Sequence, residues 1–254
     1  MMTDLSGQVA LVTGGTSGIG EAVSKGLTAR GVRVGVLSNA PQAELDAALA
    51  RGDIAAAEQV DLADAEAVMR SVARLAEKLG DAHILVNNAA VWQSNPVPES
   101  PLALFDRHID VNLKGSFYTA QAVLPAMIAR GEGRIVFVGS VSGTAGRAGD
   151  SAYSASKAGV AMLARTLATE QGPRGIRINC VCPGAVATPL TAALRTPEGE
   201  GAIAALMDGH PSPRRKFFME PGQIADLIIF LVSPASSAVH GAVIAADEGL
   251  TATM

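Results

Sequence analysis

The sequence predicts an α/β fold in which helices cover both faces of a doubly wound parallel sheet of about seven strands. Short runs rich in β-branched residues alternate with longer segments of helical periodicity along the 254 residues. Several of these runs are apolar at nearly every position, which is typical of strands buried on both faces. The length fits one large α/β domain over residues 1–254 better than two small ones.

Seven runs are predicted as strands, and helices lie between them. The strands are expected at residues 8–14, 32–38, 54–62, 83–89, 133–140, 176–184 and 241–247. The helices include residues 20–30, 64–79, 113–130 and 153–171. The irregular segment 187–221 contains five prolines and follows the carboxyl end of a strand. Because ligands of such sheets bind at that edge, we interpret this segment as a substrate lid rather than a meandering surface loop.

The composition argues against several classes of function. The net charge of −4 disfavours nucleic acid or an anionic membrane as the main partner. No apolar run approaches the roughly 20 residues of a membrane helix, and the amino terminus does not resemble a signal peptide. Cys180 and Cys182 are two residues apart in a predicted strand, where a disulfide is geometrically poor and two thiols are too few for structural zinc. We therefore expect buried thiols, no metal site and a reducing, cytoplasmic location.

The stretch LVTGGTSGIG ends the first predicted strand and opens the first predicted helix. Glycines in such a turn let the backbone approach a pyrophosphate, which the N–H groups of the helix terminus then bind. The spacing of Gly14, Gly18 and Gly20 differs from the general G-x-G-x-x-G pattern, and glycine turns also arise for structural reasons alone. The position between strand and helix is what indicates a dinucleotide site.

The stretch SAYSASKAG places Tyr153 four residues ahead of Lys157, on one face of a predicted helix. A free tyrosine has a pKa of about 10, and a nearby ammonium lowers that pKa. Tyr153 is therefore a candidate to take the proton of an alcohol or return it to a carbonyl. The alternative is a tyrosine in the core beside a lysine that reaches solvent. Ser140 favours the catalytic interpretation because it ends a strand at the active edge, although a lone serine there is more often a cap.

Six motifs follow one another along the chain: TGGTSGIG at 13–20, NNAA at 87–90, VN at 111–112, Ser140, Y-x-x-x-K at 153–157 and PGAVATP at 183–189. This ordered set resembles the compact one-domain branch of the short-chain dehydrogenase/reductase family over nearly the whole chain. The resemblance implies a Rossmann-type fold and hydride transfer between NAD or NADP and a secondary alcohol or ketone. Two alternatives keep the fold: an epimerisation or dehydration at the same site, and a dinucleotide sensor without turnover.

The resemblance also implies a role for each motif residue. Tyr153 would be the acid/base, Lys157 would lower its pKa and hold the nicotinamide ribose, and Ser140 would orient the substrate. Asn112 would distort its helix and hold a water that relays protons to the lysine. The cofactor-binding set would comprise Tyr153 and Lys157 together with Thr13, Gly14, Gly18, Ile19, Gly20, Ser38, Asn39, Asp61, Leu62, Asn88, Ala89, Ala90, Pro183, Gly184, Val186 and Thr188.

The choice between NAD and NADP depends on Ser38 and Asn39, at the end of the second predicted strand. A carboxylate there would bind the ribose hydroxyls and repel the 2′-phosphate of NADP, whereas an arginine would bind that phosphate. Neither charge is present. Because nothing at these two positions repels the phosphate, the sequence weakly favours NADP.

The substrate pocket carries a weaker signal than the cofactor site. Ser142, Thr144, Gly184 and Leu190 are expected near the reacting carbon, and Trp92 either flanks the substrate or packs under the lid. Few charged residues stand in these segments, so a neutral or partly apolar alcohol or ketone is expected. The resemblance further implies a homodimer or homotetramer packed through helices.

Overall fold

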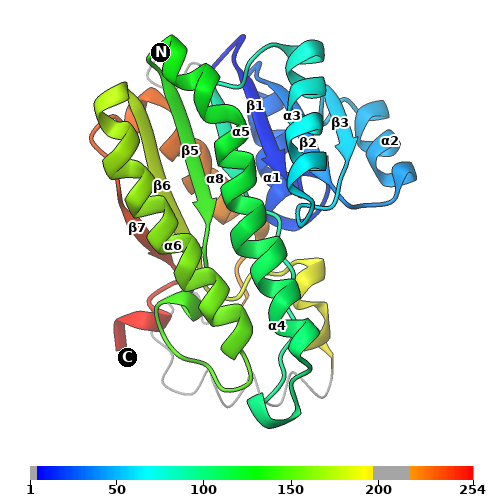
Figure 1. Ribbon diagram of the computed structural model, residues 1–254, viewed down its shortest axis with the longest axis vertical. Helices are drawn as coiled ribbons and strands as arrows, with labels where there is room; N and C mark the ends of the chain where they lie inside the picture. The colour runs from blue at the N-terminus through cyan, green and yellow to red at the C-terminus, as the bar shows by residue number, and fades with distance from the viewer. Residues whose placement is uncertain (1–4, 197–217, 254) are drawn as a thin grey trace.

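The strands form one parallel sheet in the computed structural model, which describes residues 5–196 and 218–253 (Figure 1). The strands are β1 (Val9–Thr13), β2 (Arg33–Ser38), β3 (Ala56–Gln59), β4 (Ile84–Asn87), β5 (Gly133–Val138), β6 (Ile176–Pro183) and β7 (Val243–Ala246). Their order is β3-β2-β1-β4-β5-β6-β7, and every neighbouring pair is parallel. The predicted fold class is confirmed, and each strand lies within its predicted range.

Helices connect the strands and follow the predicted alternation. They are α1 (Gly18–Thr28), α2 (Gln42–Ala50), α3 (Ala65–Leu79), α4 (Leu102–His108), α5 (Gly115–Arg130), α6 (Ser151–Gln171) and α8 (Pro221–Val232). The four predicted helices are present, whereas α2, α4 and α8 fall outside the predicted ranges. Helix α8 is apolar over most of its length, so its sequence shows little of the periodicity that marks a half-exposed helix. None of the described helices is both long and apolar enough to cross a bilayer.

Aliphatic side chains fill the space on both sides of the sheet. Helices α3, α5 and α6 cover one face, and α1 and α8 cover the other (Figure 1). Alternate residues of β5 point to opposite faces of the sheet. Ile135 and Phe137 pack in the apolar layer on the α5 side, and Val136 and Val138 pack in the layer on the α8 side. This double burial explains why the strands are apolar at successive positions.

The strand order reverses beside β1, and this reversal positions the site. The chain runs from β1 to β2 on one side and later returns to place β4 on the other side of β1. The connections that leave the carboxyl ends of β1 and β4 therefore diverge and open a crevice between them, where ligands of such sheets bind. The glycine turn at residues 14–18 lies at this point.

Candidate active site

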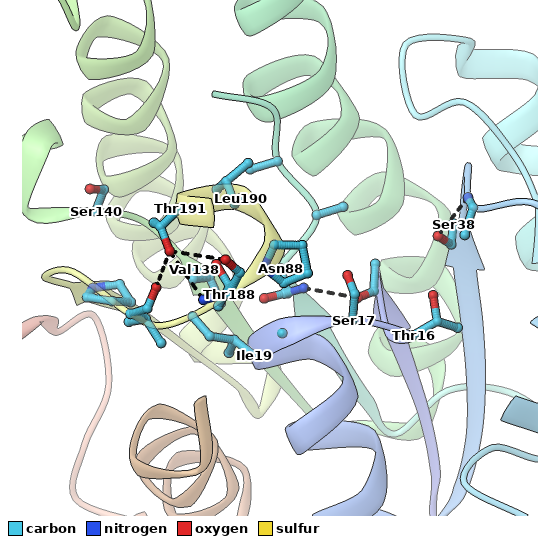
Figure 2. Close-up of a pocket in the computed structure, with 18 of the residues that line it drawn as sticks. Thr16, Ser17, Ile19, Ser38, Asn88, Val138, Ser140, Thr188, Leu190 and Thr191 are labelled. Carbon is cyan, nitrogen blue, oxygen red and sulfur yellow. Dashed lines mark hydrogen bonds between the residues drawn. The ribbon is translucent and has the colours of Figure 1, made fainter. Parts of the chain in front are cut away.

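A cavity of about 260 Å³ lies at the carboxyl edge of the sheet. It extends from Ser140, at the end of β5, to Ser38, at the end of β2 (Figure 2). The predicted residues that line it are Gly14, Gly18, Ile19, Ser38, Asn39, Asn88, Ala89, Ala90, Ser140, Tyr153, Lys157, Pro183, Gly184, Val186 and Thr188. Segments that are far apart in the sequence thus meet in one elongated cavity.

The glycine turn is shaped for close approach of a ligand to its backbone. Gly14 and Gly18 have φ angles of 63° and 53°, a left-handed conformation that strains other residues. A Cβ on Gly18 would lie 2.9 Å from the Thr188 Cγ2, and a Cβ on Gly20 would collide with the Gly14 carbonyl. The turn therefore requires glycine at these positions.

The amino terminus of α1 fits the pyrophosphate of a dinucleotide. Ser17 is the N-cap of this helix, yet its side chain makes no capping hydrogen bond. The first N–H groups of α1 therefore face the cavity without a side-chain acceptor, which suits an anion. A bound dinucleotide would lie along the cavity from this terminus, with Ser38 and Asn39 at one end and Thr188 near the other.

Thr13 and Gly20 support the cavity from behind and do not line it. The Thr13 Oγ1 accepts hydrogen bonds from the backbone N–H groups of Asn88 and Ala89, both at 2.9 Å. The Asn88 side chain donates in turn to the Thr13 carbonyl at 3.0 Å. These bonds fix the ends of β1 and β4 relative to each other, so that the two sides of the crevice keep a set separation.

Asp61 and Leu62 lie outside the cavity wall. The Asp61 carboxylate pairs with the Arg107 guanidinium of α4 at 2.8 Å, and Leu62 is buried. Their contact with an adenine stays a prediction. Sequence reasoning missed Thr16, Ser17, Glu44 and Thr191, which do line the cavity. Glu44 belongs to α2, a helix that the sequence pattern did not indicate.

Tyr153 and Lys157 lie one turn apart at the start of α6, as predicted. The Lys157 Nζ is 5.8 Å from the centre of the Tyr153 ring and donates a hydrogen bond of 2.8 Å to the Val138 carbonyl. The His108 ring packs edge-on against the tyrosine, with the ring centres 6.1 Å apart. The lysine is therefore held by the end of β5, and the tyrosine ring is held between α4 and α6.

One prediction about this pair is wrong in direction. The lysine was expected to lower the pKa of Tyr153, but burial raises that pKa to about 12 and outweighs the neighbouring Ser140 hydroxyl, which favours the phenolate. Burial also lowers the pKa of Lys157 to about 8, so this residue is a weaker cation than an exposed lysine. At neutral pH the residues of the chain alone keep Tyr153 as a neutral phenol.

Asn112 lies where the helix is distorted, as the family resemblance implied. Residues Ile109–Lys114 form a π-helical turn between α4 and α5. The Asn112 side chain accepts from the Val91 N–H at 2.8 Å and donates to the Ser156 hydroxyl at 3.0 Å. It is fully buried and lines neither cavity described here, so among the described residues it joins the segment after β4 to α6. Its role in a proton relay stays a prediction.

Ser140 combines the two roles that its position suggested. Its Oγ accepts a hydrogen bond from the Ser142 N–H at 3.1 Å and so caps the turn Val141–Gly143. The hydroxyl keeps its proton for donation, and in this structure it hydrogen-bonds to the Tyr153 side chain. Because Ser140 also lines the cavity beside Tyr153, capping fixes the hydroxyl without consuming its donor capacity.

A second cavity of about 230 Å³ adjoins the first. The two share Ser140, Tyr153, Gly184, Leu190 and Thr191. Ser142 and Trp92 line the second cavity, so the tryptophan flanks this space, whereas Thr144 is exposed and does not line it. The two cavities therefore meet at the phenol and the serine.

The segment proposed as a lid begins at the junction of the cavities. Thr188 accepts and donates in a capping box with Thr191 that opens the 3-10 turn Pro189–Arg195. Leu190 and Leu194 of this turn line the second cavity. Residues 197–217, the larger part of the predicted lid, lie outside the described residues, so the lid stays a prediction.

The fold and site together define a class of protein. A glycine turn at the switch point of a parallel sheet binds a dinucleotide, and a tyrosine, a lysine and a serine lie at the far end of the same cavity. This combination is that of an oxidoreductase that uses a nicotinamide dinucleotide.

Comparison with known proteins gives the family. Residues 8–199 match the family model described as short chain dehydrogenase. Oxidoreductase UcpA of Escherichia coli is 35% identical, over 98% of this chain and 97% of its own. Galactitol 2-dehydrogenase (L-tagatose-forming) of Cereibacter sphaeroides is 39% identical, over 97% and 96%. The structure of a proposed NAD(P)-dependent gluconate 5-dehydrogenase from Beutenbergia cavernae, solved with NADP bound, is 34% identical over 99% of this chain and all of its own, with a TM-score of 0.90.

The chain belongs to the short-chain dehydrogenase/reductase family. It is an NAD(P)-dependent oxidoreductase of the alcohol/carbonyl class.

The raised pKa of Tyr153 gives a testable titration. The chain has two tyrosines, so the difference in tyrosinate absorbance between wild type and Tyr153→Phe isolates this residue. We expect the step at a pH of about 12, well above the ordinary value of about 10, because burial disfavours the phenolate. Circular dichroism at each pH must show an intact fold. A step near the ordinary value in the folded protein would contradict the burial effect.

Proposed function

We propose that the protein interconverts a secondary alcohol and a ketone, with Tyr153 as the acid/base. One observation carries the proposal: Tyr153 and Ser140 line both the dinucleotide cavity and the adjoining cavity. A substrate in the second cavity would therefore present its oxygen to these two hydroxyls and its carbon to the first cavity. When bound there, the nicotinamide supplies or accepts the hydride.

The protonation state of Tyr153 suits donation of a proton to a carbonyl. The neutral phenol gives its proton to the substrate oxygen as the carbonyl carbon gains hydride, and it takes the proton back when an alcohol is oxidised. The Ser140 hydroxyl donates to the same oxygen and orients it. These two groups account for both proton transfer and alignment.

Lys157 would bind the cofactor beside Tyr153 and Ser140. One of its three N–H donors is used by the Val138 carbonyl, which leaves two for a ribose hydroxyl of the cofactor. Since burial lowers the pKa of Lys157 to about 8, its positive charge is lost as the pH rises above that value. We propose that Asn112 acts as the relay residue that the family resemblance implies, and its tight bonds to Val91 and Ser156 support a fixed position for it.

Two alternatives use the same fold. A dinucleotide sensor needs no acid/base, and an epimerase or dehydratase uses the cofactor without net redox change. Incubating the purified protein with a panel of alcohols and ketones, while following nicotinamide absorbance, separates them. Absence of net oxidation or reduction with every member of the panel would favour the alternatives.

Replacing the phenol should remove turnover and spare cofactor binding. We expect Tyr153→Phe to lower kcat by at least about 100-fold, because proton transfer in the transition state is lost. Dinucleotide affinity, measured by fluorescence titration, should stay within about twofold of wild type. Tyr118→Phe, at the only other tyrosine, is the matched control and should keep wild-type kcat. Normal turnover in Tyr153→Phe would exclude this tyrosine from the mechanism.

The cofactor preference depends on the Ser38 end of the cavity. Positions 38 and 39 carry a serine and an asparagine, so neither supplies a carboxylate or a guanidinium. The exposed carboxylate of Glu44 lines the same end of the cavity. We propose that the protein accepts NADP as well as NAD, as Ser38 and Asn39 suggest, and that the charge of Glu44 reduces the preference for NADP.

Two substitutions should shift this preference in opposite directions. Glu44→Gln removes a negative charge and should tighten NADP binding by about 2- to 5-fold, with NAD affinity nearly unchanged, because exposed charges interact weakly. Ser38→Asp adds a charge closer to the strand end and should weaken NADP binding by about 10-fold or more. Dissociation constants for both cofactors in both variants test this. Unchanged NADP affinity in Ser38→Asp would mean that β2 does not face the ribose phosphate.

We propose that the protein forms a homo-oligomer through the helices on the α5 side of the sheet. Met69, Phe105, Phe117 and Met162 are each about half exposed, on α3, α4, α5 and α6, which lie on the same side in Figure 1. Each of these four helices thus presents one exposed apolar side chain, and this supports an interface on this side of the sheet. Light scattering should give a dimer or tetramer that Phe117→Asp weakens. A wild-type monomer at micromolar concentration would contradict the proposal.

We propose a cytoplasmic location. Cys180 and Cys182 are buried and unlinked, with their Sγ atoms 3.8 Å apart. Thiols persist in reducing compartments, so this arrangement supports the cytoplasm, which cell fractionation tests.

A further inference from the structure

Asp150 occupies the second cavity, beside the reacting groups, and no motif accounts for it. It is the N-cap residue of α6 and lies one turn before Tyr153. Aspartate at an N-cap normally accepts hydrogen bonds from the first N–H groups of the helix. The Asp150 side chain makes no such bond. It is 1% exposed and is one of the residues that line the cavity, so it is buried there without serving the helix as a cap.

The two oxygens of this carboxylate have different surroundings. Oδ1 accepts a hydrogen bond from the Trp92 Nε1–H at 3.0 Å, which fixes the orientation of the group. Oδ2 is buried and has no hydrogen-bond partner among the described residues. The Arg147 Nε lies 3.7 Å from it, within ion-pair range but too far for a hydrogen bond, and this arginine is about half exposed. One oxygen is therefore anchored, and the other retains its accepting capacity.

A buried carboxylate oxygen without a donor is unfavourable, and a ligand that brings a donor relieves the penalty. In alcohols and hydroxyketones, the neutral group that can donate this hydrogen bond is a hydroxyl. Apart from Arg147, the remaining lining of the cavity is consistent with such a ligand, because the Ser142 hydroxyl stands there among apolar side chains, with the Thr191 and Thr251 hydroxyls, which donate to Val186 and Asp247, as further acceptors. A ligand carboxylate, in contrast, would face the buried charge of Asp150, which the half-exposed guanidinium of Arg147 at the same cavity offsets only in part.

Resting on the proposed function, we propose that the second cavity binds a neutral substrate with a further hydroxyl group, and that Asp150 Oδ2 accepts its hydrogen bond. The substrate class is thus a diol, a polyol or the corresponding hydroxyketone. Asp150 determines specificity, while Tyr153 and Ser140 act on the reacting oxygen.

The same carboxylate influences Tyr153, so the test must separate the two effects. Burial is the largest cause of the raised pKa of Tyr153, and the charge of Asp150 adds to it. A substitution of Asp150 therefore alters turnover of every substrate. The ratio of kcat/KM between two substrates that differ by one hydroxyl cancels this common effect and leaves only recognition of the extra group.

The experiment compares matched pairs, such as cyclohexanediol with cyclohexanol and hydroxycyclohexanone with cyclohexanone. In the wild type we expect kcat/KM to favour the dihydroxy or hydroxyketo member by about 10- to 100-fold, the usual range for a hydrogen bond to a charged group. In Asp150→Asn the amide can keep the Trp92 bond through its oxygen while an NH₂ replaces Oδ2. The preference should then fall to within about 3-fold.

Asp64→Asn is the matched control. Asp64 is also an N-cap, at α3, but its side chain caps that helix by accepting from the Ala67 N–H at 2.9 Å. This variant should retain the full diol preference. Trp92→Phe removes the donor that orients Asp150 and should lower the preference without removing the carboxylate.

A binding measurement gives a second readout. Trp92 is the only tryptophan, so its fluorescence reports directly on the second cavity. In Tyr153→Phe, diols should change this fluorescence at lower concentrations than the matched alcohols do, and the additional substitution Asp150→Asn should abolish the difference. Equal kcat/KM for both members of each pair, or a preference that survives Asp150→Asn, would overturn the assignment of Asp150. Turnover of no pair at all would instead contradict the proposed function.

Discussion

The hydrogen bond from the Lys157 Nζ to the Val138 carbonyl is the contact on which the arrangement of the active site depends. A buried ammonium is unfavourable unless its donors are satisfied, so this bond is needed for Lys157 to remain 3% exposed. It ties the first turns of α6 to the end of β5. The position of the Tyr153 side chain then follows from helical geometry, because this residue lies one turn before Lys157 on the same face of α6. Removing the bond would free the Lys157 side chain from the end of β5, while α6 itself stays packed on the sheet through its buried aliphatic residues.

The fold was predictable because its determinants are local. Runs of apolar residues identify strands buried on both faces, and the glycine turn identifies where β1 gives way to α1. The residues proposed as catalytic come from the family motifs, and three of the four, Ser140, Tyr153 and Lys157, line one cavity. Asp61 illustrates the limit: the family resemblance predicts that it lies near the adenine, and its ion pair with Arg107, 46 residues away in the sequence, was not part of that prediction.

Properties that depend on tertiary surroundings were not readable from the sequence. The pKa of Tyr153 follows from burial, which outweighs its neighbours, so the spacing from Lys157 alone gave the wrong direction. Glu44 reaches the cavity only because α2 folds back beside the end of β2. Asp150 belongs to none of the sequence motifs, and the proposal about it depends on its burial and on the bond to Trp92, which is 58 residues away in the sequence.

The division of the site into two cavities has a consequence for how such enzymes diversify. The glycine turn and the ends of β1, β2 and β4 line only the first cavity, whereas residues within 141–150, Leu194 and the carboxyl-terminal residues around Leu250 line only the second. Changes in the second group leave dinucleotide handling and the aliphatic layers of the sheet intact. A single scaffold can therefore acquire new substrates by drift in a few peripheral segments, which accords with relatives that share this architecture yet are named for different alcohols.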